Sequence, residues 1–422
     1  MGIPTFPGII FRRFDILNKL KILAPGQTFP CILIFYILVP GHIETAMAEV
    51  SSRQDTMTLF MAGDVMTGRG IDQVLARPGD PVLYEPYVKD ARKYVELAEI
   101  INGPIRSPVD CQYIWGDALV EWERVRPAVR LVNLETSITT SNQNWPDKGI
   151  HYRMHPGNTR CLTAAGIDIC SLANNHVLDW GYPGLIDTLD TLKSMDIKYT
   201  GAGRNRQEAG TPVIFDVING GRIIVFSYGL GSSGIPAIWA AREDRAGVNY
   251  LSDLSEATIR QIMDAVSTVK QQGDIVVASI HWGGNWGYDV RGSHIDFAHR
   301  LIDETGIDVI HGHSSHHPKP LEIYNGKLII YGSGDCINDY EGIGGYEEYR
   351  DDLVLMYFAN IDRFNGKLVQ LQMIPMQIKN FSLNRASRKD AMWLQKTLNR
   401  EGKKYGTQLH LNEGNILVVP AD

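Results

Sequence analysis

Four histidines lie within seven residues of this chain: His311, His313, His316 and His317. Imidazole nitrogen binds Zn, Mn, Fe and Ni well, and so dense a run after an apolar segment is rare by chance. We therefore predict that His313 and His316 are metal ligands, whereas His311 and His317 support them or are structural. The alternative is a histidine-rich loop that binds metal only adventitiously.

Four other polar residues follow apolar segments earlier in the chain and add oxygen and nitrogen donors to this prediction. A carboxylate can bind one metal ion or bridge two, and a neutral Asn or His can complete the coordination. Taken singly, each could be a turn residue or a structural histidine. Taken together, they predict a metal site with these further ligands: Asp64, Glu135, Asn175 and His281.

His176 directly follows Asn175, and this makes it a candidate proton donor to a leaving group. Asp179 lies about one helical turn farther on and could orient that histidine. Arg69 could face an anion and neutralise developing negative charge. The alternatives are a histidine satisfied within an Asn-rich turn, a carboxylate at a helix N-terminus and a solvated arginine.

Substrate binding is predicted for Asn174, Trp282 and Trp286. The two indole rings could form an apolar wall or a stacking platform beside the metal ligands. Plain burial of both rings is the alternative.

These polar residues need elements that bring them together, and the hydrophobic pattern predicts strands that do so. Each of five apolar segments ends in one of the polar clusters, and helical spacing such as Leu185, Leu189 and Leu192 occurs between them. In open α/β sheets, ligands bind outside the carboxyl ends of the strands, so we expect all five clusters at one edge. The predicted strands are 57–62, 129–134, 167–172, 275–280 and 307–310.

The last third of the chain is predicted to add strands and one helix, with a strong hairpin signal at Asn325-Gly326. The expected strands are 322–324, 328–331, 353–360 and 368–374, and the expected helix is 387–399. The predicted divisions of the chain are a leader (1–48), an α/β domain (57–360) and a C-terminal extension of strand and helix packed on that domain (361–422).

The first 48 residues have the pattern of an export signal. Four basic residues precede an apolar run at 29–39, and Ala46-Met47-Ala48 has the small-x-small form of a signal-peptidase site. The run is too short for a comfortable membrane span. We expect a signal peptide or short membrane anchor on an exported, cell-envelope protein. A misassigned start, on a cytoplasmic protein, is the alternative.

The composition of the chain limits the classes of partner that it can bind but says little about its activity. The 422 residues are 44 % hydrophobic and 21 % charged, as in ordinary soluble proteins. A net charge of -7 argues against nucleic acid as the main partner, because phosphate binding needs a concentrated basic surface. None of the five cysteines pairs at CxxC spacing, so structural or free thiols are expected.

The order of the motifs resembles the calcineurin-type metallophosphatases and, in closer detail, the CapA-type proteins of poly-γ-glutamate capsule biosynthesis. The resemblance covers roughly residues 59–358 and implies a four-layer αββα sandwich, an α/β fold with metal-binding loops at the carboxyl edge of the strands. The matching segments are Gly63–Met66, Asn133–Glu135, Ala173–His176, His281–Gly283 and Gly312–His316, and Gly247-Val248-Asn249 is similar to a further turn of the family.

Three positions depart from the pattern of the ordinary metallophosphatases. Met66 stands where those enzymes place a metal-binding His, and a thioether is a poor ligand for a hard ion. Glu135 replaces the usual bridging Asp with a longer side chain. The loop His313-Ser314-Ser315-His316 has one residue more than their Gly-His-x-His. Phosphodiesterase activity therefore does not follow from the resemblance.

The ligands and the resemblance together predict one or two divalent metal ions (Mn, Zn or Fe) in a hydrolase that directs metal-activated water at a phosphoester or an envelope-polymer linkage. The family's link with poly-γ-glutamate makes an anionic γ-glutamyl polymer the candidate substrate and a membrane polymer synthase or exporter a candidate partner. The alternative is a non-catalytic, envelope-anchored module that binds or exports the same polymer.

Overall fold

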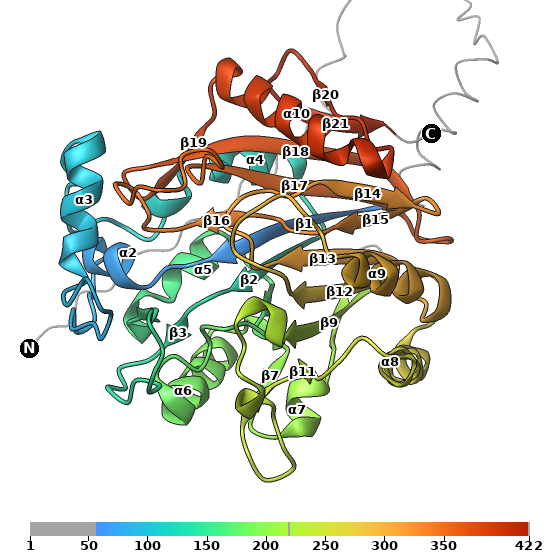
Figure 1. The fold of residues 1–422 in the computed structure, drawn as a ribbon, viewed down its shortest axis with the longest axis horizontal. Coiled ribbons are helices and arrows are strands. Elements are labelled where there is room, and N and C mark those ends of the chain that lie inside the picture. Colours follow the sequence, from blue (N-terminus) through green and yellow to red (C-terminus); the bar gives the residue numbers. More distant parts are fainter. Residues whose placement is uncertain (1–55, 218–219, 421–422) are drawn as a thin grey trace, which may run out of the picture. The chain divides into compact units, whose positions relative to one another are not determined.

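The computed structural model describes residues 56–217 and 220–420. The predicted leader (1–48), with Cys31, lies outside the described residues. The described residues belong to one unit of the chain, and their strands form two large sheets with helices outside them (Figure 1). Within the described part, no helix is both long and apolar enough to cross a membrane.

The first sheet has ten strands in the order β20-β21-β18-β17-β1-β2-β5-β6, with β16 paired to β1 and β19 to β18. Strands β2 and β16 both run parallel to β1, whereas β17 is antiparallel to it. The strands are β1 (Thr56–Val65), β2 (Val129–Leu134), β5 (Ile169–Ser171), β6 (Lys198–Thr200), β16 (Asp335–Ile337), β17 (Leu353–Asp362), β18 (Leu368–Lys379), β19 (Ser382–Arg385), β20 (His410–Leu411) and β21 (Leu417–Pro420).

The second sheet has seven strands in the order β11-β9-β12-β13-β15-β14, with β8 paired to β9. Strands β9, β12, β13 and β15 run parallel. The strands are β8 (Val213–Asp216), β9 (Arg222–Leu230), β11 (Tyr250–Leu251), β12 (Ile275–His281), β13 (Val309–His313), β14 (Leu321–Tyr324) and β15 (Lys327–Ile330); two small pairs are β3 (Ser137–Ile138) with β4 (Arg153–Met154), and β7 (Ala202–Gly203) with β10 (Gly247–Val248).

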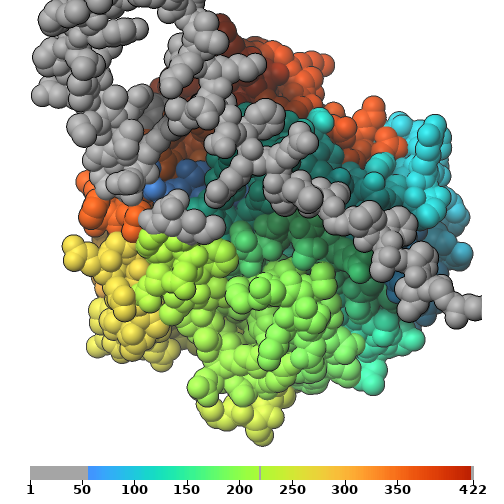
Figure 2. All heavy atoms as spheres, turned by 180° about the vertical axis from the view of Figure 1, so that it is seen from behind, coloured from blue at the N-terminus to red at the C-terminus, as the bar shows by residue number. Residues whose placement is uncertain are grey.

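Helices lie in sequence between most of these strands. The α-helices are α2 (Arg69–Val74), α3 (Arg92–Asn102), α4 (Ala118–Val125), α5 (Arg160–Ala164), α6 (Gly181–Ser194), α7 (Arg206–Gly210), α8 (Glu256–Val269), α9 (Gly292–Glu304) and α10 (Arg388–Gly402). Short 3-10 helices are η1 (Tyr113–Trp115), η2 (Pro156–Asn158), η3 (Gly231–Ser233), η4 (Ala237–Trp239) and η5 (Lys403–Tyr405). Seen from behind, the segment from β5 to β11 (green to yellow-green) covers much of the lower half of the molecule (Figure 2).

The central strands bury both faces, as unbroken apolar sequence runs predict. In β1, Met61 belongs to a core between the sheets that includes Val277 of the second sheet. Its neighbour Phe60 faces outward and packs edge-on against Trp122 of α4. On the outer face of the second sheet, α8 and α9 share a third core with β12. The layers are therefore helices, sheet, sheet and helices, the αββα sandwich that the resemblance implied.

The predicted hairpin at Asn325-Gly326 is confirmed. Strands β14 and β15 pair antiparallel with Tyr324 opposite Lys327, and the two turn residues have φ of 51° and 78°. Positive φ at both positions is what a type I′ turn requires, and Asn-Gly adopts it at little steric cost.

Strand pairing brings the polar ends of the strands together. Asp64 lies opposite Asp335 in the β1–β16 pair, and His281 lies opposite His313 in the β12–β13 pair. The four described cysteines are free thiols: Cys111, Cys161, Cys170 and Cys336, the last of which follows Asp335 in β16.

Candidate metal centre

Two carboxylates share one amide donor: Asp64, the next-to-last residue of β1, and Glu135, which directly follows β2. The Asn133 Nδ2 group donates to Asp64 Oδ1 at 2.7 Å and to Glu135 Oε2 at 3.2 Å. Both carboxylates are buried, and Asp64 is fully so. Because Asn133 sits in the parallel strand beside Asp64, the register of β1 and β2 fixes this arrangement.

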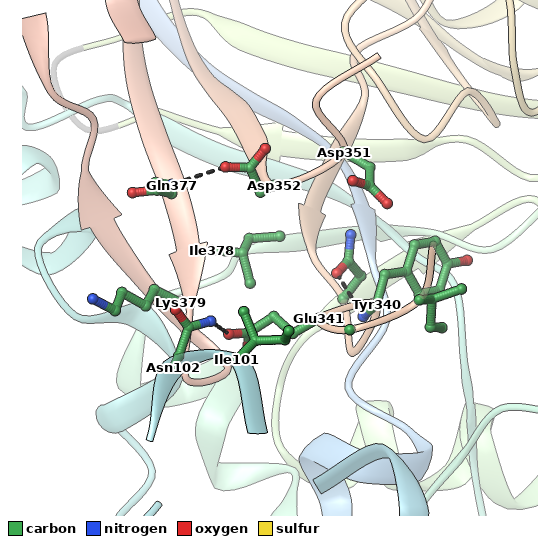
Figure 3. A pocket seen from close by; sticks show the side chains of 12 residues that line it. Ile101, Asn102, Tyr340, Glu341, Asp351, Asp352, Gln377, Ile378 and Lys379 are labelled. Carbon is green, nitrogen blue, oxygen red and sulfur yellow. Dashed lines mark hydrogen bonds between the residues drawn. The ribbon is translucent and has the colours of Figure 1, made fainter. Parts of the chain in front are cut away.

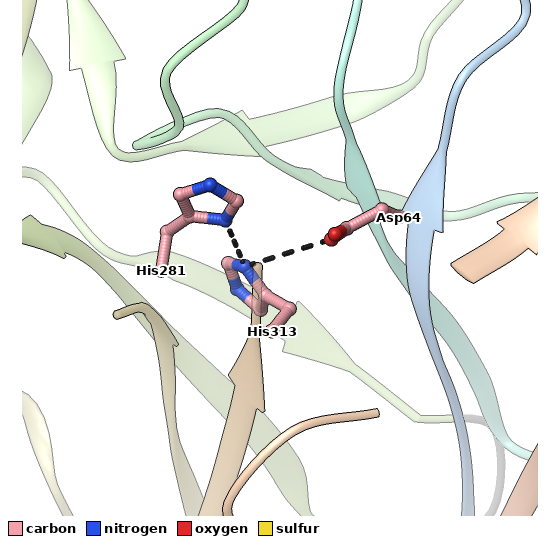
Figure 4. A group of neighbouring side chains, drawn as sticks. All are labelled: Asp64, His281 and His313. Carbon is pink, nitrogen blue, oxygen red and sulfur yellow. Dashed lines mark hydrogen bonds and ion pairs between the residues drawn. The ribbon is translucent and has the colours of Figure 1, made fainter. Parts of the chain in front are cut away.

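The ends of β12 and β13 contribute two imidazoles that face Asp64 (Figure 4). The Nδ1 atoms of His281 and His313 lie 2.8 Å apart, and His313 Nδ1 lies 4.0 Å from Asp64 Oδ1. One ligand atom from each of these three buried residues falls within 4.8 Å of the others. Ser279 holds the far nitrogen of His313 at 2.9 Å and also contacts His311 Nδ1 at 3.1 Å.

A second group of potential ligands also contains Asp64, together with His316 and Asp335, again within 4.8 Å of one another. His316 Nδ1 lies 2.9 Å from Asp335 Oδ1, and Asn338 donates to the other oxygen of Asp335 at 2.7 Å. Asp64 therefore belongs to both three-ligand groups. A carboxylate shared in this way could bridge a pair of metal ions.

Asn175 and Glu135 adjoin the first group. Asn175 Oδ1 lies 3.0 Å from His281 Nε2, and Glu135 Oε1 lies 3.8 Å from the same nitrogen. Asn174 lies behind these ligands: its Nδ2 donates to Asn133 Oδ1 at 3.0 Å, and its Oδ1 accepts the backbone N–H groups of His176 and Val177 at 3.1 and 3.0 Å. The Asn174 side chain is fully buried and shapes the loop that carries Asn175.

His176 is held by a carboxylate on one side and faces Glu135 on the other. Its Nδ1 lies 2.6 Å from Asp179 Oδ2, and its Nε2 lies 3.7 Å from Glu135 Oε1. Lys148 pairs with Asp179 and lies 3.0 Å from His176 Nδ1. The Tyr152 ring packs edge-on at 4.5 Å, and its backbone N–H donates to Asp179. The imidazole is thus fixed in orientation with Nε2 directed at the ligand cluster.

Burial dominates the electrostatics of the cluster. Burial, with help from Asp335, raises the pKa of Asp64 to about 7, and burial beside Asp64 raises the pKa of Glu135 well above its ordinary value. Burial also lowers the pKa of His281 and His313, so both imidazoles are neutral and keep a lone pair for coordination. For His316, burial works against the charged form, but the Asp335 carboxylate outweighs it and raises the pKa.

The donor set fits a divalent cation. In the described part of the chain, Asp64, Glu135 and Asp335 have no Lys or Arg within ion-pair distance, and their ionic contacts are to histidines. Buried carboxylates without a cation are costly, and bound metal ions supply the missing positive charge. Mixed carboxylate and imidazole donors suit Mn, Fe and Zn.

The structure does not bring every predicted site residue to this cluster. Arg69 is buried, and its guanidinium donates hydrogen bonds of 3.1 Å to Asp339 and to Glu85. The Tyr152 ring packs against both Arg69 and His176 and so lies between them. Trp282 is buried, donates to a backbone carbonyl at 3.0 Å and stacks on a histidine of α9.

Trp286 lies beside the cluster and contacts it through an imidazole. Its ring approaches His316 at 5.4 Å and stacks on Tyr346 at 3.9 Å. Trp286 is therefore the predicted aromatic residue nearest to a potential ligand, whereas Trp282 is part of the core of the second sheet.

A small pocket of about 230 Å³ opens next to the second ligand group (Figure 3). Its lining includes Asn338, which binds Asp335, and Tyr340, whose hydroxyl lies 3.4 Å from His316 Nε2. Asp351 also lines it, and burial together with Asp335 raises the pKa of Asp351 to about 7. The pocket gives a solute a place beside the cluster without displacing core residues.

Several residues of the site were missed by sequence reasoning. Asp335 was within reach, because Gly334-Asp335 repeats the Gly-Asp of the first motif a few residues after an apolar strand. Asn133 lies inside a motif that was recognised for Glu135. Lys148 has no signal of its own, since it sits in a long loop with no periodic pattern.

This chain is similar to known bacterial proteins, several of them named for capsule synthesis. A family described as bacterial capsule synthesis protein PGA_cap matches residues 58–340, about two thirds of the chain. A Mycobacterium tuberculosis protein named a probable polyglutamine synthesis accessory protein is 46 % identical over 374 residues, covering 88 % of this chain and 98 % of that protein.

Two further relatives carry names from capsule synthesis. The capsule biosynthesis protein CapA of Bacillus anthracis is 25 % identical over 338 residues (80 % of this chain, 71 % of the relative). The PGA biosynthesis protein CapA of Bacillus subtilis is 26 % identical over 327 residues (77 % and 73 %). A crystal structure described as a novel phosphatase of Mycoplasma pneumoniae aligns with a TM-score of 0.43 at 12 % identity, over 79 % of this chain and 95 % of that one.

Proposed function

This chain belongs to the bacterial capsule synthesis family PGA_cap, and from that premise we propose that it is a metal-dependent hydrolase that cleaves a phosphoester or an envelope-polymer linkage. One observation carries the proposal. Asp64 belongs to two potential three-ligand groups at once, and a fixed His176 faces the same cluster through Glu135. A module that only binds polymer has no need for a held imidazole beside a metal pair.

The residues that would hold metal ions are Asp64, Glu135, Asn175, His281, His313, His316 and Asp335. When bound there, divalent ions supply Lewis acidity, which lowers the pKa of water and offsets charge on the oxygens of the scissile group. We expect one or two ions of Mn, Zn or Fe, because the donors are carboxylates and imidazoles rather than thiolates.

The chain's own acid–base group is His176. Its Nδ1 lies 2.6 Å from Asp179 Oδ2, so Nε2 is the nitrogen that would exchange a proton with the leaving group. Burial lowers the pKa of His176 well below its ordinary value, so Nε2 must first be protonated before it can give a proton, and the Asp179 carboxyl group beside Nδ1 favours the charged ring. Lys148 keeps Asp179 in place through their ion pair. Asn175 positions the imidazole of His281 through a 3.0 Å contact. These contacts support proton transfer at a defined atom without rearrangement of the loop.

The proposed substrate is an anionic γ-glutamyl polymer or a phosphoester attached to the envelope. Two relatives are named for CapA in capsule or PGA biosynthesis and a third for polyglutamine synthesis, which supports a role in the synthesis of a capsule polymer. That the polymer is built of γ-glutamyl units is what the family resemblance implies. We further propose an exported or envelope-anchored location and a membrane polymer synthase or exporter as partner. A cytoplasmic protein remains the alternative, and the position of the mature N-terminus distinguishes the two.

The second candidate function is a non-catalytic module that binds or exports the same polymer. Met66 favours it, because this buried thioether stands near the ligands and accepts a weak contact from the Tyr340 hydroxyl at 3.7 Å where ordinary metallophosphatases have a ligand. His176 and its partners oppose it, for the reason given above.

The test compares the full chain with two histidine variants after reconstitution with Mn or Zn. His313→Ala removes a potential ligand, and His410→Ala is the matched control because His410 is exposed on β20. Metal per chain is measured by mass spectrometry. Hydrolysis is measured on an aryl phosphodiester and, as new amino groups, on a γ-glutamyl oligomer.

We expect metal and turnover to fall together in His313→Ala and to stay unchanged in His410→Ala. Metal without turnover of either substrate class would favour the binding module. No metal in the wild-type protein after reconstitution would overturn the proposal.

A further inference from the structure

A cleft of about 660 Å³ lies between α7, the β9–β11 edge of the second sheet and α8. In the view from behind, the yellow-green segment of α7 and β11 adjoins the yellow segment of α8 (Figure 2). The volume is in the range of sites that bind small molecules. None of the residues lining it belongs to the metal centre, so its purpose has to be sought separately.

Tyr228 of β9 is the first sign that the cleft receives a ligand. Its side chain is 5 % exposed and lines the cleft, and its hydroxyl forms no hydrogen bond to any described residue. The hydroxyl oxygen itself reaches the solvent of the cleft, because it is not among the buried polar atoms that lack a hydrogen bond. Burial raises the pKa of Tyr228, so the group stays protonated and can donate a hydrogen bond into the cleft.

Arg206 is the second sign, because it is the one charged side chain among the residues lining the cleft. Its neighbour Arg204 pairs with Asp190 and with Glu208, whereas the guanidinium of Arg206 has no ion pair with any residue in the described ranges. Arg206 is exposed at the start of α7 and so stands at the mouth. An unpaired guanidinium there favours an anionic group.

About half of the lining is small or apolar. It includes Ala209, Ala241 and Val248 together with Ile262 and Ala265 of α8, and the remaining residues are mainly uncharged and polar. Val248 belongs to the Gly247-Val248-Asn249 turn, in which a Cβ on the glycine would stand 2.2 Å from a backbone carbonyl oxygen. The close approach of two backbones at this turn holds one wall in place.

We infer that this cleft is a second binding site, for a small ligand with one anionic group on an apolar or aromatic body. The anionic group binds Arg206 at the mouth, a hydrogen-bond acceptor on the ligand meets the Tyr228 hydroxyl, and the body lies against the alanine and isoleucine side chains. The inference goes beyond the proposed hydrolase and does not depend on it.

The test uses 8-anilinonaphthalene-1-sulfonate, an aromatic dye with one sulfonate, titrated by fluorescence into the folded full chain. We expect saturable binding of one dye per chain. Arg206→Met removes the charge at similar length and should weaken binding by about tenfold, the equivalent of roughly 1.4 kcal/mol. Ala265→Trp fills the cleft and should abolish binding.

Arg242→Met is the matched control, because Arg242 is an exposed arginine outside the cleft lining and should leave the dye affinity unchanged. Displacement by 2-naphthoate and by uncharged 2-naphthylmethanol then tests the ligand class. The carboxylate should displace the dye at about tenfold lower concentration than the alcohol.

The inference is overturned if the dye does not saturate at one site, or if Ala265→Trp leaves its binding intact. Equal effects of Arg206→Met and Arg242→Met, or equal displacement by the acid and the alcohol, would overturn the assignment of an anionic ligand. Because Arg206 is exposed, its substitution tests charge without threatening the fold.

Discussion

At the scale of single residues, His176 is the group whose role is easiest to separate from metal binding. It is not a member of either three-ligand group, yet its Nε2 faces Glu135. We predict that His176→Gln lowers kcat on whichever of the two assay substrates the wild type hydrolyses by about 10²–10⁴-fold, the usual contribution of a positioned acid, while metal per chain stays the same. His410→Gln, at an exposed position, should change neither. Loss of metal in His176→Gln would make the residue a ligand and contradict the proton-donor role.

Asp64 and Asp335 should differ in how much metal they control. Asp64 belongs to both ligand groups, whereas Asp335 belongs to one. In a site that binds two ions, Asp335→Asn should lower metal per chain by about half, and Asp64→Asn should lower it further because the shared carboxylate is gone. Metal analysis after reconstitution at one fixed metal concentration measures this. Equal loss in both variants would mean that the two groups do not bind separately.

Some of the candidate metal ligands could be predicted from the sequence, and others could not. Asp64, His281 and His313 each end an apolar run, so the chain pattern located them, and the structure brings their ligand atoms within 4.8 Å. That they bind metal stays a prediction. Asp335 was not located, because a Gly-Asp dipeptide in a loop usually marks a turn. Only the pairing of β16 with β1, which no local pattern encodes, sets it opposite Asp64.

At the scale of elements, the contact between β1 and the segment before β16 depends on Gly63. A Cβ at this position would stand 1.7 Å from the carbonyl oxygen of Gly334. We predict that Gly63→Ala lowers the free energy of unfolding by about 1–3 kcal/mol or more and reduces metal binding, because the strands must move apart. Gly292→Ala is the control, since a Cβ there meets no atom within 4 Å. Urea unfolding and metal analysis of both variants test this prediction. If Gly63→Ala kept the stability and the metal content of the wild type, the close approach of the two backbones would be contradicted.

Arg69 ties α2 to two distant loops through Asp339 and Glu85, all three of them buried. Arg69→Met would leave two buried carboxylates without their cation, so we expect the free energy of unfolding to fall by about 3–5 kcal/mol. Arg92→Met should cost about 0–1 kcal/mol, because the Arg92 side chain is 65 % exposed in its pair with Asp90. Chemical unfolding measures both. If Arg69→Met kept its stability but lost turnover, the residue would instead act on the substrate, as the sequence led us to expect.

Long apolar runs and turn residues made many strands and one hairpin predictable from the sequence. Very short strands could not be predicted in this way. The run at 275–280 became β12 almost residue for residue, and Asn325-Gly326 fixed its hairpin by the φ values that it tolerates. The two-residue strands β3, β4, β7 and β10 have too few positions to show any alternation. Their existence depends on partners distant in the chain.

At the scale of the whole molecule, the sequence predicted that the central strands are buried on both faces, but it did not predict which sheet each strand joins. The resemblance implied two sheets between helices, and the apolar strands agree with it. Strands β17 and β18, however, follow the second sheet in sequence and join the first, where β17 pairs with β1. Hydrophobic pattern is the same for either choice, so only the packing of the complete chain selects the partner.

The buried cluster also makes a prediction for the stability of the whole protein. In the metal-free state, burial beside Asp335 raises the pKa of Asp64 to about 7, and burial beside Asp64 raises that of Glu135 well above 4.5. Above pH 6.5 the carboxyl groups of the unfolded chain have lost their protons, whereas the folded protein still holds some on Asp64 and Glu135. At these two groups the folded state therefore binds more protons, and their contribution to stability falls as the pH rises through about 7.

Bound metal should abolish this loss of stability with rising pH. A divalent ion takes the place of the retained protons and favours ionised carboxylates, so the metal-loaded protein should lose no stability over the same range. We expect the metal-free protein to lose up to about 1.4 kcal/mol per pH unit for each retained proton, and the loss to shrink in Asp64→Asn, which cannot titrate. Urea unfolding at a series of pH values above 6.5, with chelator and with Mn, measures both curves. Metal-free curves of the same slope for the wild type and Asp64→Asn would show that Asp64 is ionised without a cation, and the case for a metal centre built on its burial would fail.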